Sequence, residues 1–160
     1  MKKIAVLFVI LLFIASFAAC STDKQAENLS DVGESTRTVE EITQEIKEEL
    51  SYLDCQYEQD GNTVTMRIIS GWTPDVLRYF AEEIVEENET TINLWDQERI
   101  HYVPIQTAVE EKYAELGHPE IDVRVEVYSQ DETESLLVFK VDDGELQYDI
   151  MPELIDIVKE

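Results

Sequence analysis

The chain has few of the residue types that build reactive or metal-binding sites. Its 160 residues include two cysteines, two histidines and five glycines. The histidines, His101 and His118, form no His-x-x-x-His pair that would bind zinc. The glycines are spread singly, so no phosphate-binding loop is present, and no Gly-x-Ser-x-Gly motif marks a serine nucleophile. The sequence therefore predicts no catalytic, metal-ligating or cofactor-binding residue.

Positive charge is also scarce. The chain has 12 Lys and Arg residues against 36 Asp and Glu residues, which gives a formal net charge of −24. This balance excludes nucleic acid as a partner, because phosphate binding requires a basic surface. Cations and basic peptides are the partners that such a surface attracts. The simplest interpretation of the acids remains a solvated, soluble surface.

The first 20 residues have the three-part layout of a secretory signal. Lys2 and Lys3 make a basic start, and an apolar run follows from Ile4 to Phe17. That run is shorter than the roughly 20 residues of a membrane-spanning helix, so a permanent transmembrane anchor is not expected. Ala18 and Ala19 then precede Cys20.

On these residues the segment resembles the bacterial lipoprotein signal peptide, although Phe17 stands where that family prefers leucine. The resemblance implies cleavage before Cys20 and attachment of a lipid to its sulfur. It therefore implies a membrane-anchored chain on the extracytoplasmic face. The alternative is an ordinary secretory signal cut near Ala19.

The rest of the chain divides into two parts. Residues 20–38 would be a lipidated cysteine and a flexible tether, because residues 21–38 are polar and bury too little to order themselves. Residues 39–160 would form a single acidic domain. With Lys2 and Lys3 removed, the net charge becomes 10 − 36 = −26. Only Cys55 would remain as a free thiol, so the fold rests on packing without a disulfide, and we interpret Cys55 as a buried strand residue.

Hydrophobic periodicity and turn residues predict the elements of this domain. Helices are expected from about Thr38, from Thr73-Pro74-Asp75, over Pro104–Leu116 and over Pro152–Val158. Strands are expected over Tyr52–Gln59, Thr63–Ser70, Ile121–Tyr128, Ser135–Val141 and Glu145–Ile150, with turns at Asp60-Gly61-Asn62, Gln130–Glu134 and Asp142-Asp143-Gly144. Residues 88–103 are expected to be a long loop with short extended pieces.

These elements predict an α+β fold, in which helices pack on one face of an antiparallel sheet of about 4–5 strands. Helix, strand, turn and strand follow one another twice, over residues 39–70 and 104–141. Either a duplicated α-β-β unit or a chance similarity of two hairpins would produce this order.

The best candidate for a binding surface is aromatic. Trp72 follows a strand, and Trp95, His101 and Tyr102 lie in the expected loop of residues 88–103. Exposed tryptophans commonly anchor interfaces, and long loops in small domains are often functional. Buried tryptophans would simply belong to the core, and this is the favoured interpretation of both; the binding surface requires that both are exposed and close together.

Three functions follow as hypotheses. The first is a non-enzymatic binding or accessory module of the cell envelope, whose partner is a protein or a basic peptide. The second is a small envelope enzyme that uses acidic residues, and the third is a structural or assembly subunit of an envelope complex.

Overall fold

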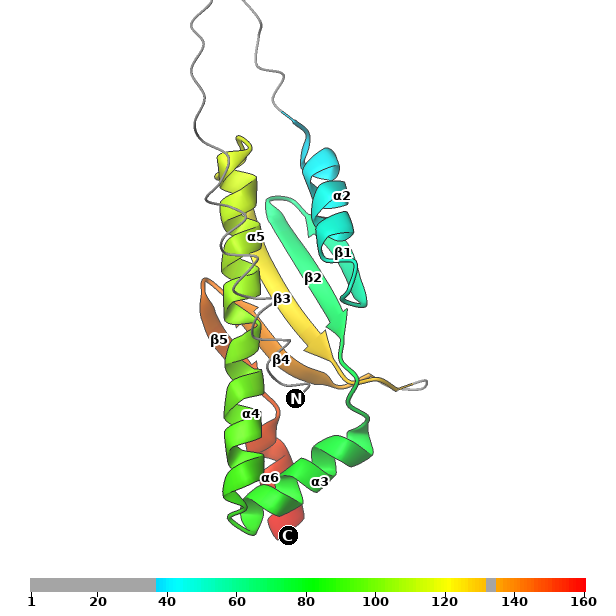
Figure 1. Cartoon of the computed structure of the whole chain (residues 1–160), viewed down its shortest axis with the longest axis vertical. Helices are drawn as coiled ribbons and strands as arrows, with labels where there is room; N and C mark the ends of the chain where they lie inside the picture. The colour runs from blue at the N-terminus through cyan, green and yellow to red at the C-terminus, as the bar shows by residue number, and fades with distance from the viewer. Residues whose placement is uncertain (1–36, 132–134) are drawn as a thin grey trace, which may run out of the picture. The chain divides into compact units, whose positions relative to one another are not determined.

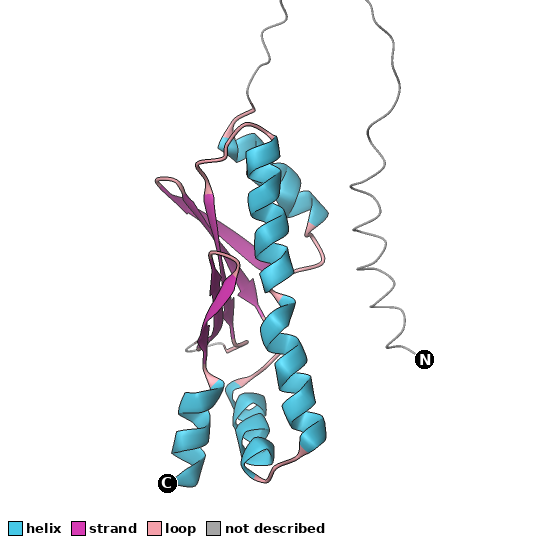
Figure 2. Cartoon of the chain, turned by 90° about the vertical axis from the view of Figure 1, so that its left-hand side faces the viewer, coloured by secondary structure: helices cyan, strands magenta, loops and turns pink. Residues whose placement is uncertain are grey.

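A five-stranded sheet carries its helices on one face (Figures 1 and 2). The computed structural model describes residues 37–131 and 135–160. The signal segment, Cys20 and most of the expected tether lie outside this range, as does part of the Gln130–Glu134 turn. The described helices are α2 (Val39–Glu49), α3 (Pro74–Val85), α4 (Glu89–His101), α5 (Val103–Glu115) and α6 (Met151–Lys159). The strands are β1 (Cys55–Asp60), β2 (Thr63–Ile69), β3 (Asp122–Tyr128), β4 (Leu137–Asp142) and β5 (Glu145–Asp149).

The strands lie in chain order across the sheet, β1-β2-β3-β4-β5. Three neighbouring pairs are antiparallel, and the central pair of β2 and β3 is parallel. A parallel pair needs a long crossover, and here the chain makes it through α3, α4 and α5. The predicted α+β class is confirmed, with a sheet that is mostly antiparallel.

The core lies on the face of the sheet that α2 and α5 cover. Alternate residues of the two central strands are almost fully buried there, which follows from the period of two along a strand. The helices contribute Ile42, Ile46, Val109 and Tyr113 to the same core. The strands contribute Val64, Met66, Ile68, Val123, Val125, Val127, Phe139 and Val141.

The two expected hairpin turns form as the sequence predicts. Gly61 takes φ 60° between β1 and β2, and Asp143 and Gly144 take φ 53° and 72° between β4 and β5. Two-residue hairpins need such left-handed positions, which Gly adopts without strain and Asp tolerates.

Residues 88–103 differ from the prediction, because they form α4 and not a loop. Asn88 caps this helix by accepting hydrogen bonds from the backbone N–H groups of Thr90 and Thr91. The buried positions Thr91, Trp95 and Tyr102 follow helical spacing. The run of β-branched residues at Thr90, Thr91 and Ile92 hides this pattern, since such residues favour strands.

Two element boundaries also shift. The first strand begins at Cys55 and not at Tyr52, because α2 is followed by a turn whose Leu53 N–H donates to the Leu50 carbonyl. Helix α5 begins directly after α4, and Pro104 separates the two because it has no N–H group to continue the hydrogen-bond pattern of α4.

The topology favours chance similarity over a duplicated α-β-β unit. Strands β1 and β3 run in opposite directions, because β1 is antiparallel to β2 and β2 is parallel to β3. Yet α2 and α5 lie on the same face and contact each other, through a hydrogen bond between the hydroxyls of Thr43 and Tyr113. A rotation that superposed the strands in sheet order would carry one helix to the opposite face.

A left-handed residue joins α3 to α4. Glu87 has φ 59°, and the chain around it makes the two hydrogen bonds of a Schellman motif, from Glu87 N to Ile84 O and from Asn88 N to Glu83 O. Glycine is the residue that normally occupies this position, since a Cβ atom is strained there.

We expect Glu87→Gly to stabilise the domain by about 0.5–1 kcal/mol, because relief of the left-handed strain exceeds the added entropy of the unfolded chain. The matched control is Glu86→Gly, where φ is −79°. That change should destabilise by about 0.5–1 kcal/mol. Urea unfolding of both variants measures the difference, and destabilisation by Glu87→Gly would contradict this description of the turn.

Candidate functional site

Most of the aromatic residues predicted to form a binding surface belong to the core. Trp95 is 4% exposed and Tyr102 is 7% exposed. The core interpretation of Trp95 is therefore confirmed, and the placement of Trp95 and Tyr102 on a candidate binding surface is wrong. Trp72 is half-buried and packs against Trp95, with ring centroids 5.7 Å apart. Of the four candidates only His101 is exposed, and its ring is nearly perpendicular to that of Tyr102, with ring centroids 5.3 Å apart.

The structure brings these aromatics together with two others that the sequence analysis did not select. We call Trp72, Phe80, Trp95, Tyr102 and Phe139 the aromatic cluster. Its centre is Trp95 against Phe139, at 4.9 Å between ring centroids. Such tilted and edge-on contacts add to the burial of large apolar surfaces, so the cluster joins α3 and α4 to the strand β4.

Asp149 fixes the polar end of this cluster. Its carboxylate accepts a hydrogen bond from the Trp95 indole N–H, at 3.2 Å, and another from the Met151 backbone N–H at the start of α6, at 2.8 Å. Arg99 lies 3.8 Å away. A buried indole needs an acceptor, and these contacts satisfy it, so we assign Trp95 and Asp149 to the fold.

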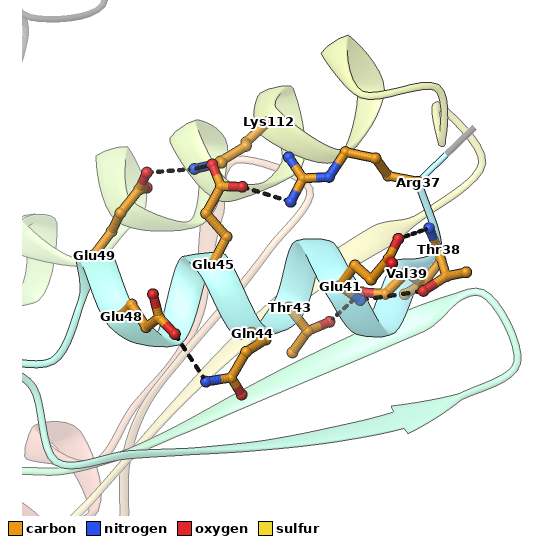
Figure 3. A network of polar contacts seen from close by, with 10 residues as sticks. All are labelled: Arg37, Thr38, Val39, Glu41, Thr43, Gln44, Glu45, Glu48, Glu49 and Lys112. Carbon is orange, nitrogen blue, oxygen red and sulfur yellow. Dashed lines mark hydrogen bonds and ion pairs between the residues drawn. The ribbon is translucent and has the colours of Figure 1, made fainter. Parts of the chain in front are cut away.

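A second polar network holds the first residues of the domain (Figure 3). Lys112 on α5 reaches across to α2, where its Nζ lies 2.8 Å from Glu45 and 2.6 Å from Glu49. Glu45 also pairs with the guanidinium of Arg37 at 2.5 Å. Lys112, and then Arg37, lower the pKa of Glu45. We call Arg37, Glu45, Glu49, Lys112 and His118 the junction, because the chain enters the described domain there.

His118 fixes the backbone of the same segment. Its Nε2 lies 2.6 Å from the carbonyl oxygen of Arg37, and its Nδ1 lies 3.0 Å from Glu120. The Arg37 carbonyl and then Glu120 raise the pKa of His118, because both stabilise an imidazolium that donates from its two nitrogens. Gly117, at φ 100°, ends α5 as predicted and turns the chain so that the imidazole faces Arg37.

The remaining thiol is not a reactive group. Cys55 is half-buried in β1, and burial raises its pKa to about 11. The thiol is therefore protonated at neutral pH, when only a thiolate would be a strong nucleophile.

Two open depressions lie on the surface. The larger, of about 340 Å³, lies beside α5 and the β4–β5 turn, with Gln106, Glu110, Glu111 and Asp143 among its lining residues. The buried Gln106 makes three hydrogen bonds there, with Val123, Gly144 and Glu110. The smaller, of about 230 Å³, lies on the uncovered face of the sheet between Glu58, Arg67, Arg124 and Glu126.

Ion pairs across the strands occupy that uncovered face. Arg67 lies 3.0 Å from Glu58 and 3.6 Å from Glu126, and Arg124 lies 2.9 Å from Asp142. Opposite charges on neighbouring strands stabilise a sheet modestly. These ion pairs keep the uncovered face polar. Each of these charged groups has a partner of opposite charge, so none of them indicates a bound ligand.

Two acid–histidine pairs have a spacing that bears on metal binding. Glu98 and His101, and likewise Glu115 and His118, stand three residues apart, a spacing that occurs in metal sites. Residues 37–131 and 135–160 contain no group of three potential His, Cys, Asp or Glu ligands. No helix within these ranges is long and apolar enough to cross a bilayer.

Comparison with family models, with curated proteins and with solved structures found no match for the chain.

We expect Lys112→Met to destabilise the domain by about 1–2 kcal/mol, because two carboxylates would lose their shared, largely buried cation. Lys159→Met removes the same charge from an exposed site at the end of α6. That control should change the free energy of unfolding by less than about 0.5 kcal/mol. Equal effects in urea unfolding would show that Lys112 acts only through net charge.

The raised pKa of His118 predicts a pH dependence. Its contribution to stability is fully present below the unfolded value near 6.5, and it is lost as the pH rises through the higher folded pKa. The stability difference between the native chain and His118→Asn should therefore be larger at pH 5.5 than at pH 9, in urea unfolding at both values. His101→Asn controls for the loss of a histidine outside the junction, and equal effects of the two substitutions at each pH would contradict the prediction.

Proposed function

We propose that the chain is a lipoprotein held at the extracytoplasmic face of the cell membrane by a lipid on Cys20. Its domain would act there as a non-enzymatic binding or accessory module of the cell envelope. The basic start, the short apolar run and the small residues before Cys20 support the anchor. Two acyl chains on one cysteine would hold the protein stably, where a single chain would not.

The junction is the structural observation that carries this proposal. Arg37 is tied to α2 through Glu45 and to the end of α5 through His118. Thr38 adds a capping box, in which Thr38 and Glu41 each accept a hydrogen bond from the other's backbone N–H. The first turn of the domain is thus fixed at the point where a tether would join it (Figure 3).

The enzyme alternative receives no support from the carboxyl groups. A general acid at neutral pH needs a raised pKa. Among the described residues, the two carboxyl groups with a resolved shift both have a lowered pKa, Glu45 through Lys112 and Glu120 through His118. Both carboxylates are therefore held in the charged form by a cation.

The structural or assembly alternative has one observation in its favour, the uncovered polar face of the sheet. A subunit of a larger complex would present a wide flat surface of this kind.

A matched pair of substitutions tests the assembly alternative. Thr65→Arg places a large charged side chain on the uncovered face. If this domain assembles through the face, the change should abolish co-purification with the complex, while Glu111→Arg on α5 should leave it intact.

Metabolic labelling tests the anchor. Cells that express the full chain would be supplied with an alkyne analogue of palmitate and then separated into membrane and soluble fractions. We expect the native chain and Cys55→Ala to carry the label and remain with the membrane. Cys20→Ala should carry no label and leave the membrane. An unlabelled, soluble native chain would refute the proposal and favour ordinary secretion.

A further inference from the structure

The end of the domain away from the junction consists of α3, α4 and α6, which we call the head. Helix α3 packs against both α4 and α6. Figures 1 and 2 agree that the chain enters at the start of α2 at one end and that the head lies at the other. If Cys20 anchors the chain, the tether joins the domain at the junction, and the head is the end of the domain farthest from that attachment. This orientation rests on the proposed function.

Exposed apolar side chains gather on the head. Six large hydrophobic residues of the described part are exposed, and five of them are on α3, α4 or α6. These five are Val76, Tyr79, Leu94, Ile100 and Ile157. The sixth is Tyr52, in the turn before β1. Single exposed apolar residues are ordinary on protein surfaces. The informative observation is that nearly all of the exposed large hydrophobic residues of the described part belong to the head.

On the solvent-exposed side of α3, the exposed aromatic residue Tyr79 lies among acidic residues. Positions 76, 79, 82, 83 and 86 follow helical spacing and share one side, while Leu77 and Ala81 are buried on the other. We call Val76, Tyr79, Glu82, Glu83 and Glu86 the Tyr79 stripe. Glu83 and Glu86 follow Tyr79 by four and seven residues, so their side chains lie on the side of α3 that carries the ring. The charge of Glu83 raises the pKa of the Tyr79 phenol.

The acids of the Tyr79 stripe stand where the helix itself disfavours them. The carbonyl end of a helix carries partial negative charge, and the last turn of α3 contains no basic residue. Arg78 lies 3.7 Å from Glu82. Glu83 accepts a hydrogen bond from the Asn88 side-chain amide. Among the described residues no ion pair includes Glu83 or Glu86, so their negative charge has no cationic partner on the domain itself.

We propose that the Tyr79 stripe is the docking surface for a cationic segment, rich in Arg or Lys, of another cell-envelope protein. The phenol ring offers a face for a guanidinium or ammonium group, and Glu83 and Glu86 supply the opposite charge beside it. Val76 and the ring provide apolar area for the stem of a long basic side chain. The acids of α5 differ, because Glu110 and Glu111 have no exposed large hydrophobic residue on their helix.

Binding of a synthetic peptide of alternating Arg and Ala tests this surface. The full chain would be purified in an uncharged detergent and titrated with the peptide at low and at physiological salt. We expect the triple substitution Tyr79→Ser, Glu83→Gln, Glu86→Gln to weaken binding about fivefold to tenfold. Glu110→Gln with Glu111→Gln on α5, which removes the same charge, should weaken it by less than about twofold.

A single pair of substitutions separates the ring from the charge. Tyr79→Ser and Tyr52→Ser remove the same side chain from sites that are 56% and 68% exposed. Only Tyr79→Ser should weaken binding, by about twofold to fivefold, and unchanged unfolding transitions would confirm that both variants fold.

Equal losses in the α3 and α5 variants would overturn the proposal, since the peptide would then respond to net charge alone. Failure of the native chain to bind the Arg-Ala peptide would also overturn it. Metabolic labelling of Cys20 in the α3 variant shows separately whether the lipid anchor is present, so that a failure of the docking proposal can be distinguished from a failure of the anchor. A labelled, membrane-bound native chain without peptide binding would refute the docking surface and leave the anchor intact.

Discussion

The contact between Trp95 and Phe139 is the interaction on which the arrangement of sheet and head depends. It joins a helix that lies largely beyond the sheet to the centre of β4, and Trp72, Phe80 and Tyr102 complete the packing around it. Asp149 then links the Trp95 indole to the start of α6. Three helices of the head are thus positioned through one aromatic side chain and one carboxylate.

A one-sided core explains why this contact is needed. Helices α2 and α5 cover one face of the sheet, and the other face is kept polar by cross-strand ion pairs. Packing of the head on that polar face would bury its ion pairs, and the desolvation of charged groups is costly even when they are paired. The head is fixed instead at the end of the sheet, through the aromatic cluster. The result is a domain with two different ends, a junction held by ion pairs and a head with exposed apolar and acidic side chains.

The sequence predicted most of the elements, because each carried its own local signal. The strict alternation around Val123, Val125 and Val127 marked β3, and Thr73-Pro74-Asp75 marked the start of α3. Helix α4 was missed because its buried residues are only Thr91 and Trp95, with Tyr102 directly after it. Asn88 as a cap, with Glu89 in the first turn and Arg99 in the last, was the signal that could have found it.

The candidate site could not be predicted for a different reason. Whether Trp72, Trp95 and Tyr102 face solvent depends on the packing of α4 against β4, which connects residues far apart in the chain. The Tyr79 stripe was not predicted, since no pattern in the sequence distinguished Tyr79 from the other aromatic residues. The ion pairs of Lys112 with α2 are likewise long-range and carry no local signature.

The proposed anchor at Cys20 determines which end of the domain is attached to the membrane, so the mature N-terminus is the decisive quantity. Mass spectrometry of the protein extracted from membranes measures it directly. The account predicts a chain that begins at Cys20 and carries the added mass of a diacylglycerol on that residue. A chain that begins at Cys20 with a free thiol, or one that retains the signal segment, would contradict it.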